Sequence, residues 1–217
     1  MPPKPKYTKE EIASAAFEII KKDGLSALTA RDLGAYLGTS SRPIFTYFRT
    51  MEELKLAARE IALREFIDYV SDYREYTPAF KRIGMMIVSY GIHKPELFKL
   101  LFMQEHKEKR GFGSTISDLG EISDVCTELI MKEYGMTGEQ AELIFEQMWT
   151  QAYGLGVMCA MGVCDLSDEE IGRQLGIGFA GLMMLIRSGM IDEIHSDVEK
   201  NTDGTFHGNK SGDVPYK

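Results

Sequence analysis

The feature that most constrains this chain is residues 28–48, whose pattern predicts two short amphipathic helices folded over one turn. Thr29 is a candidate N-cap for the first helix, because a threonine hydroxyl accepts a hydrogen bond from a backbone N–H of the first turn. Leu33 and Leu37 lie four residues apart and share one helix face. Gly38 begins the turn, since glycine readily adopts the left-handed backbone that ends a helix. This spacing is typical of a helix-turn-helix.

The second helix of the motif is expected to begin between Ser40 and Pro43, because proline is tolerated only in the first turn of a helix. Ile44 and Phe48 are expected to face inward. In a helix-turn-helix protein, the N-terminal end of this helix enters the major groove of DNA. A helical hairpin that binds no DNA would show the same pattern. The exposed candidates to read base edges and hold phosphates are Ser41, Arg42, Pro43, Thr46 and Tyr47.

Two further helices flank the motif. Thr8 and Glu11 predict a capping box at the start of the first one, and Gly24 ends it. Its apolar face is expected to complete a three-helix domain. Thr50 opens the other helix, whose pattern continues to about Tyr76 and corresponds to a length of about 40 Å. A helix of this length is expected to leave the small domain and enter a second one.

The remaining sequence predicts further helices. One is expected to end near Gly91, and another runs from about Ser117 to Tyr134. The last two, 138–162 and 168–187, are broad and apolar, as a self-complementary four-helix interface between two chains requires. A glycine inside a helix is unfavourable by about 1 kcal/mol relative to alanine, so close helix packing is expected where glycines recur. The last helix contains Gly172, Gly176, Gly178 and Gly181.

Charge is distributed unevenly along the 217 residues. The whole chain has a formal net charge of -8, which argues against a generally basic nucleic-acid binder. Residues 1–50 nevertheless contain eight Lys or Arg against five Asp or Glu, a net of +3, and the remainder carries -11. The first residues form a short basic arm that suits phosphate contact or a solvated terminus. Its lysines are Lys4, Lys6 and Lys9.

Enzyme, metal and membrane functions find no support in the sequence. Cys126, Cys159 and Cys164 lack the tight spacing of a metal site and are interpreted as reduced thiols. The four histidines are scattered, and no grouping of nucleophile and base or phosphate-binding loop occurs. No signal peptide is evident and no apolar run approaches a membrane span. We expect a cytoplasmic protein with no catalytic residue, metal or cofactor and no membrane partner.

The segment from Thr8 to Leu54 resembles the DNA-binding domain of the TetR family of bacterial transcription regulators. The resemblance begins with residues 12–38, IASAAFEIIKKDGLSALTARDLGAYLG. It covers about the first quarter of the chain, in an order and spacing that a generic helical hairpin would not reproduce. The other residues that carry it are Ser40, Ile44, Phe45, Tyr47, Phe48, Glu52, Glu53 and Leu54.

The resemblance implies an all-α fold with an N-terminal three-helix domain joined through a long fourth helix to a larger helical domain. We expect a DNA-binding domain at residues 1–50, with the helix-turn-helix at about 29–48 and the start of the connecting helix reaching about residue 65. Ligand binding and dimerisation are expected in residues 51–194. In this family the last two long helices usually form the dimer. The polar composition of residues 195–217 predicts a flexible tail.

The resemblance also assigns DNA-contacting residues, with two departures. Phe45 stands where the family commonly has Tyr, and Met51 where it commonly has Lys, so two phosphate contacts are in doubt. Lys55, Arg49 or Lys6 are candidates to replace them. The complete predicted set is Lys6, Thr29, Ser40, Ser41, Arg42, Pro43, Phe45, Thr46, Tyr47, Arg49 and Lys55.

The favoured function is a homodimeric repressor that binds a palindromic DNA operator and is released by a small-molecule effector. The alternative is a ligand-binding or scaffold protein with weak or lost DNA binding, given Met51 and Phe45. Large apolar residues at helical spacing are candidates to line the effector cavity, and an ordinary core explains them as well. They are Met86, Tyr90, Phe98, Phe102, Phe145, Met148 and Trp149.

Overall fold

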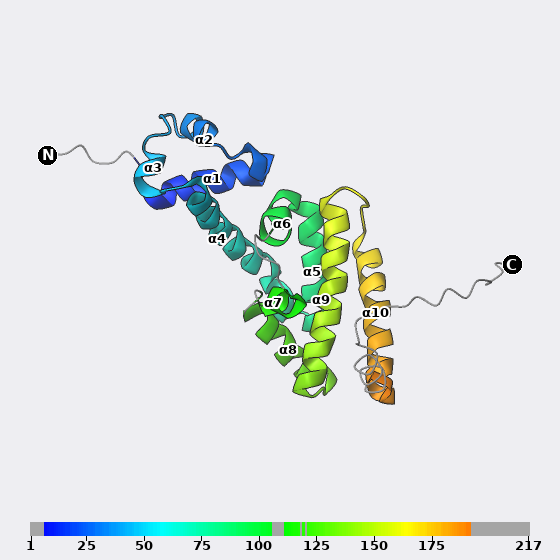
Figure 1. The fold of residues 1–217 in the computed structure, drawn as a ribbon. Helices are drawn as coiled ribbons and strands as arrows, with labels where there is room; N and C mark the ends of the chain where they lie inside the picture. The colour runs from blue at the N-terminus through cyan, green and yellow to red at the C-terminus, as the bar shows by residue number, and fades with distance from the viewer. Residues whose placement is uncertain (1–6, 106–110, 118, 120, 192–217) are drawn as a thin grey trace, which may run out of the picture. The chain divides into compact units, whose positions relative to one another are not determined.

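The computed structural model describes residues 7–105, 111–117, 119 and 121–191, and within these the chain forms helices and no strand (Figure 1). The predicted all-α fold is confirmed. The chain divides into two compact units whose boundary, after Phe179, falls inside the last helix. Lys6 and the predicted tail at 195–217 lie outside the described residues. The elements are α1 (Lys9–Asp23), η1 (Leu25–Ala27), α2 (Ala30–Tyr36), α3 (Ile44–Tyr47), α4 (Met51–Val70), η2 (Ser71–Glu75), α5 (Ala79–His93), α6 (Pro95–Phe102), α7 (Phe112–Ser117), α8 (Glu121–Tyr134), α9 (Gly138–Ala160) and α10 (Asp168–Ser188).

Side-chain caps set the starts of several helices, as the sequence predicts. Thr8 and Glu11 form the expected capping box of α1, and Gly24 ends that helix at a φ of 84°. The Thr29 hydroxyl accepts a hydrogen bond from Asp32 N–H at 3.1 Å, which caps α2. These bonds satisfy backbone N–H groups that the first turn of a helix leaves unpaired.

The connecting helix α4 is shorter than its sequence pattern indicates. The prediction that it continues to about Tyr76 is wrong, because α4 ends at Val70 and a 3₁₀ turn follows. The Ser71 hydroxyl donates to the Asp68 carbonyl oxygen at 2.7 Å, a local bond that competes with helix continuation. Asp72 in this turn forms an ion pair with Arg82 of α5 at 2.6 Å. The chain therefore turns back toward α5 here.

A second difference concerns the predicted helix from about Ser117 to Tyr134. The helix in this segment is α8, which begins only at Glu121, and a separate helix, α7, ends at Ser117. Leu119 N–H donates to the Ile116 carbonyl oxygen at 3.0 Å, in the manner of a turn. A one-dimensional apolar pattern continues across such a turn, which is why the pattern did not reveal it.

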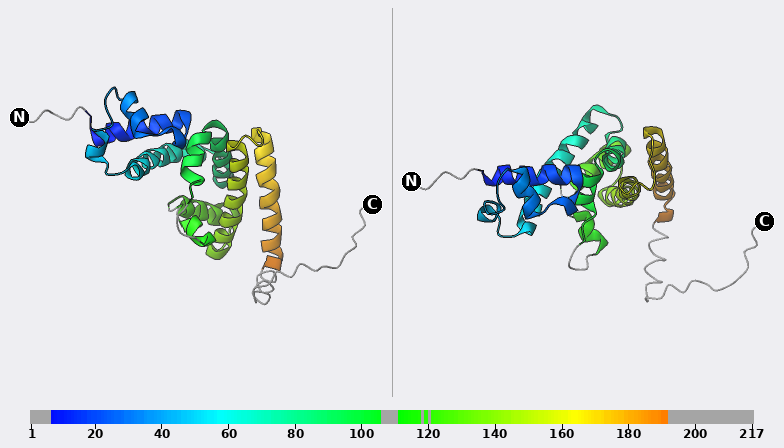
Figure 2. Two further views of the ribbon diagram at one scale, coloured as in Figure 1. Left: turned by 45° about the horizontal axis from the view of Figure 1, so that its top comes forward. Right: turned by 90° about the horizontal axis from the view of Figure 1, so that it is seen from above.

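Helices α5 and α9 pack side by side at a glycine contact (Figure 2). A Cβ placed on Gly91 would lie 2.6 Å from the Gly156 carbonyl oxygen, and one on Gly156 would lie 2.6 Å from the Phe98 ring. The helix predicted to end near Gly91 ends at His93, two residues further on. Gly91 is required for close approach and not for termination.

The glycines of α10 differ from one another in surroundings. A Cβ on Gly172 would meet only the Met85 side chain at ordinary contact distance, whereas one on Gly178 would collide with the Gln151 side chain. Gly176 and Gly181 have no described atom close to the position of a Cβ. Close packing within the chain thus accounts for Gly178 only.

Polar contacts of α4 link the N-terminal helices to α5 and α6. Glu65 of α4 forms ion pairs with Lys21 of α1, at 2.9 Å, and with Lys94 between α5 and α6. Partial burial tends to raise the pKa of Glu65, but hydrogen bonds and attraction from the two lysines outweigh it and lower the pKa below its ordinary value. Arg59 of α4 donates to the Leu101 carbonyl oxygen of α6 at 3.1 Å. These contacts join α1 and α4 to α6 and to the residue between α5 and α6.

Candidate DNA interface and ligand cavities

The turn between α2 and α3 is shaped by two glycines. Gly38 has a φ of 62°, the left-handed conformation that glycine adopts without strain. A Cβ on Gly34 would lie 3.1 Å from backbone atoms of Thr39, Ser40 and Ser41. Thr39 N–H donates to the Gly34 carbonyl oxygen at 2.9 Å, which closes the turn. The two helices are consequently held at a short distance, as the motif requires.

Two buried side chains anchor the recognition segment, residues 40–49, on the N-terminal helices. Ile44 and Phe48 are buried, as predicted, and α3 begins directly after Pro43. The side chain of Lys9 lies over the Phe48 ring at 5.3 Å from the centroid. With these anchors turned inward, the remaining side chains of the segment are exposed or half-buried.

The outward side chains of the recognition segment have hydrogen-bonding groups. Arg42, Phe45, Thr46 and Arg49 are exposed, and Tyr47 is half-buried. Thr46 donates to the Arg42 carbonyl oxygen at 3.4 Å, a local bond that leaves its acceptor capacity available. In the described part of the chain, the guanidinium groups of Arg42 and Arg49 have no ion-pair partner. This segment is therefore equipped to contact phosphates and base edges.

The other predicted DNA-contacting residues are placed as follows. Ser40 is exposed, and Ser41 and Pro43 are half-buried, within the recognition segment. Thr29 lies at the start of α2 with its hydroxyl engaged in capping. Lys55 instead pairs with Glu52 at 2.8 Å and lines a groove shared with α6.

Sequence reasoning missed two residues beside the motif. Tyr36 of α2 has 60% of its surface exposed, and its position outside the Leu33 and Leu37 face was the signal that pointed to it. Tyr7 donates its hydroxyl to the Leu37 carbonyl oxygen, which ties the N-terminal arm to the turn. Nothing in the local pattern indicates this second contact, because the partners are far apart in sequence.

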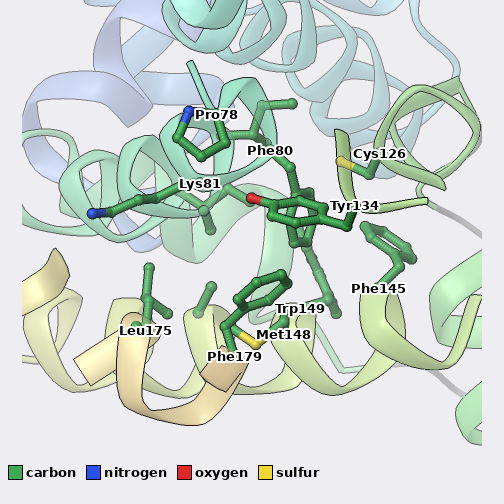
Figure 3. A pocket seen from close by; sticks show the side chains of 15 residues that line it. Pro78, Phe80, Lys81, Cys126, Tyr134, Phe145, Met148, Trp149, Leu175 and Phe179 are labelled. Carbon is green, nitrogen blue, oxygen red and sulfur yellow. The ribbon is translucent and has the colours of Figure 1, made fainter. Parts of the chain in front are cut away.

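The helical body contains an apolar cavity of about 220 Å³, which we call the aromatic cavity (Figure 3). It lies among α5, α8, α9 and the first half of α10. Aromatic and aliphatic side chains make up nearly all of its surface. The lining residues are Pro78, Phe80, Lys81, Ile83, Gly84, Ile87, Cys126, Tyr134, Phe145, Met148, Trp149, Ala152, Leu175, Gly176 and Phe179.

Few polar groups reach the aromatic cavity. Burial, and then the nearby Glu133 carboxylate, raise the pKa of Tyr134 to about 12, so its phenol stays neutral. Glu133 itself accepts hydrogen bonds from Ala79 N–H at 2.6 Å and Phe80 N–H at 3.2 Å, which caps α5. Burial likewise raises the pKa of the Cys126 thiol to about 12, which makes it a poor nucleophile.

A second, larger cavity of about 550 Å³ lies against α4, and we call it the connecting-helix cavity. Trp149 lines both cavities and so stands in the wall between them. Tyr153 donates its hydroxyl to the Phe102 carbonyl oxygen at 3.0 Å at this site. The lining residues are Arg59, Leu63, Ile67, Leu101, Phe102, Phe112, Thr115, Leu119, Glu121, Ile122, Trp149, Thr150 and Tyr153.

The predicted ligand-binding residues divide into two groups. Phe145, Met148 and Trp149 line the aromatic cavity, and Phe102 joins Trp149 in the connecting-helix cavity. The others line neither of these two cavities and are buried in the core; they are Met86, Tyr90 and Phe98.

Tyr90 is notable within that core. Its hydroxyl is buried and has no hydrogen-bond partner among the described residues, and burial raises its pKa above the ordinary value. Its ring makes an edge contact with the Phe66 ring, at 5.0 Å between centroids. Sequence reasoning did not select Tyr134 and Phe179 of the aromatic cavity as ligand-binding residues, although both lie within predicted helices.

Comparison with known proteins identifies the motif. Residues 12–58 match the family described as "Bacterial regulatory proteins, tetR family". This range holds α2, the turn, the recognition segment and the start of α4, which are the elements that form the geometry described above. The chain belongs to the TetR family. It is therefore a transcriptional regulator with a helix-turn-helix DNA-binding domain.

Two relatives extend the comparison beyond the motif. An uncharacterized HTH-type transcriptional regulator of Mycobacterium tuberculosis is 23% identical over 171 residues, which is 76% of each chain. The structure of a TetR-family protein from Vibrio parahaemolyticus superposes with a TM-score of 0.53 at 16% identity. The match covers 80% of this chain and 98% of that one, and shows that this TetR-family chain shares its fold.

Two searches of the described residues complete the site description. No group of three or more His, Cys, Asp or Glu side chains in this part of the TetR-family chain is arranged to hold a metal ion. None of its described helices combines the length and apolar character of a membrane-spanning segment.

Proposed function

We propose that this TetR-family regulator is a homodimeric repressor that binds a palindromic operator and is released from it by a small molecule. The observation that carries the DNA-binding part is the recognition segment, with Ile44 and Phe48 buried and Arg42 exposed without an ion-pair partner in the described chain. An exposed guanidinium at the start of a recognition helix suits bidentate contact with guanine or a phosphate.

The dimer interface is proposed to be α9 and α10, at about 138–162 and 168–187. Large apolar side chains on α10 are left uncovered, with Ile177 exposed by 66% and Met184 by 74%. These residues are seven positions apart and so lie on one face of the helix. Gly181, four positions after Ile177, leaves room beside them for a partner backbone. A second copy of the same surface would bury this stripe.

Release by ligand is proposed to act through dimer and helix geometry. Two recognition helices must meet successive major grooves about 34 to 36 Å apart. The aromatic cavity borders α10, and the connecting-helix cavity borders α4, so a ligand in either one contacts an element that sets this spacing. A shift of the equilibrium from 1:99 to 99:1 needs about 5.5 kcal/mol of preference for the released state.

The experiment that tests the proposal is selection of bound sequences from a random duplex library. We expect enrichment of an inverted repeat, since each half of a symmetric dimer reads the same half-site. Arg64→Ala serves as a control, because Arg64 is exposed on α4 and lies outside the recognition segment. This variant should enrich the same repeat. Enrichment of single half-sites only would contradict the dimeric part.

The alternative function is a scaffold or ligand-binding protein with weak or lost DNA binding, which the exposed Phe45 and half-buried Met51 favour because they lack a phosphate-binding group. Salt dependence separates the two functions. A protein that neutralises phosphates shows a binding constant that falls steeply as salt rises. We expect this negative slope with operator DNA, and a flat dependence would support the scaffold.

A further inference from the structure

The walls of the aromatic cavity are formed mainly by aromatic and other apolar side chains. Five aromatic rings from four helices line it, and Met148 and Cys126 add polarisable sulfur. Phe80, Phe145 and Trp149 are almost wholly buried, so the protein itself already excludes water from their rings. A flat aromatic ring is the ligand shape that offers the largest contact area to such walls.

The size of the cavity limits the ligand. An apolar cavity of about 150 Å³ in a protein interior stays dry and takes up benzene. The aromatic cavity measures about 220 Å³, so it has room for one ring with substituents or two fused rings. Larger ligands would have to displace side chains of a close-packed core.

The polar groups limit the charge of the ligand. Tyr134 lies across the cavity and its hydroxyl has no hydrogen-bond partner among the described residues (Figure 3). Lys81 is exposed at the rim with its ammonium directed away from the rings, and the Glu133 carboxylate already accepts hydrogen bonds from the start of α5. A charged ligand would lose its hydration here without gaining a buried counter-ion.

We propose that the aromatic cavity binds an uncharged aromatic molecule of one or two rings, whose single polar group hydrogen-bonds the Tyr134 hydroxyl. The inference rests on the proposed function, since such a molecule is taken to be the class of effector. It is tied to α10 by its lining: Leu175, Gly176 and Phe179 of α10 border the cavity, and Leu175 Cδ1 lies only 3.4 Å from a Cβ built on Gly84 of α5, so α5 and α10 meet at the cavity wall. A ring in the cavity would therefore contact the proposed dimer helix directly.

Binding is tested directly by isothermal titration calorimetry of the full chain, without DNA. The probes are toluene, 4-methylphenol and benzoate, which share one ring and differ in polarity and charge. We expect toluene and 4-methylphenol to bind, with 4-methylphenol at least as tight despite the water that its hydroxyl gives up. Benzoate should bind at least about a hundredfold more weakly, because its carboxylate is desolvated without a partner.

Two variants locate the site. Tyr134→Phe should weaken the binding of 4-methylphenol by about threefold to tenfold, as expected for loss of one hydrogen bond, and leave the affinity for toluene unchanged. Gly84→Met places an adaptable side chain in the cavity and should abolish binding of both probes. Thermal unfolding of Gly84→Met should occur at or above the native temperature, because a helix-interior glycine is removed.

The outcomes separate the two proposals. Tighter binding of benzoate than of toluene would overturn the uncharged class and leave the regulator proposal intact. If none of the three probes binds to protein that still binds its operator, the proposed ligand class is likewise overturned and the regulator proposal stands. Equal effects of Tyr134→Phe on toluene and 4-methylphenol would overturn the hydrogen bond. Binding that follows the expected order without change in operator affinity would confirm the cavity chemistry and refute ligand release.

Discussion

The recognition segment and the aromatic cavity differ in whether the same side chains serve both folding and binding. In the recognition segment, Ile44 and Phe48 hold the fold while Arg42 faces outward, so anchoring and contact are done by different residues. In the cavity, Phe145 and Trp149 are core residues and lining residues at once. Function at the first site should be separable from stability by mutation, whereas at the second the two should change together. The predictions below test this difference, from the largest expected effect to the smallest.

The stability of the helical domain should be most sensitive to substitutions at the contact between α5 and α9. Gly91→Val forces a branched side chain against the Gly156 carbonyl oxygen, and we expect the free energy of unfolding to fall by about 3 kcal/mol. Urea denaturation followed by circular dichroism measures this change. The matched control is Gly154→Ala, since Gly154 lies in α9 with no described atom near a Cβ, and it should unfold no earlier than the native protein. Equal stability of Gly91→Val and native protein would show that the crossing is loose.

The recognition segment should show the opposite behaviour. Arg42→Ala and Tyr47→Ala are each expected to weaken operator binding by about 1–3 kcal/mol, or about tenfold to a hundredfold, with the dimer still folded. Electrophoretic mobility shift at fixed salt gives the affinity, and Arg64→Ala provides the control for loss of one positive charge. If both variants bind the operator as the native protein does, a different surface faces DNA.

The exposed stripe of α10 should matter for assembly more than for folding. Ile177→Glu is expected to raise the dimer dissociation constant by about tenfold, because a carboxylate would be buried at the centre of an apolar interface. Sedimentation velocity over a dilution series measures the constant. Met131→Glu is the control, as Met131 is also an exposed apolar residue but lies on α8. A dimer unaffected by Ile177→Glu would place the interface elsewhere.

The smallest expected effect concerns Glu65, which links the N-terminal helices to Lys94 between α5 and α6. Because the folded-state pKa of Glu65 is lowered, its ionised form adds stability above the unfolded pKa, near the ordinary 4.5. That contribution is lost as pH falls through the lower, folded-state value. Glu65→Gln should therefore cost about 1 kcal/mol at pH 7, and the difference from native protein should shrink as the medium is acidified below that range. A difference that does not depend on pH would show that charge is not its source.

Sequence alone predicted the features that depend on neighbours along the chain. Thr8, Thr29 and Thr50 cap their helices through bonds to residues three positions away, so the starts of α1, α2 and α4 were recognisable. The inward turn of Ile44 and Phe48 also follows from helical spacing. These signals are local, and the structure preserves them.

Features that depend on distant segments were not predictable in the same way. The sequence placed a helix end near Gly91 but did not show that another helix crosses there, because this contact depends on Gly156 in a distant segment. The candidate ligand residues share this ambiguity. Phe98 and Phe145 are both buried aromatic residues at helical spacing, yet of the two only Phe145 lines the aromatic cavity. Packing leaves gaps that no one-dimensional pattern records.

Trp149 gives this protein an optical property of its own. It is the only tryptophan among the 217 residues, and its indole ring stands between the two cavities. Indole emission shifts in colour and brightness with the polarity of its surroundings. The intrinsic fluorescence of the unlabelled protein should therefore report ligand binding in either cavity. A second tryptophan introduced elsewhere would add its emission to that of only one native residue.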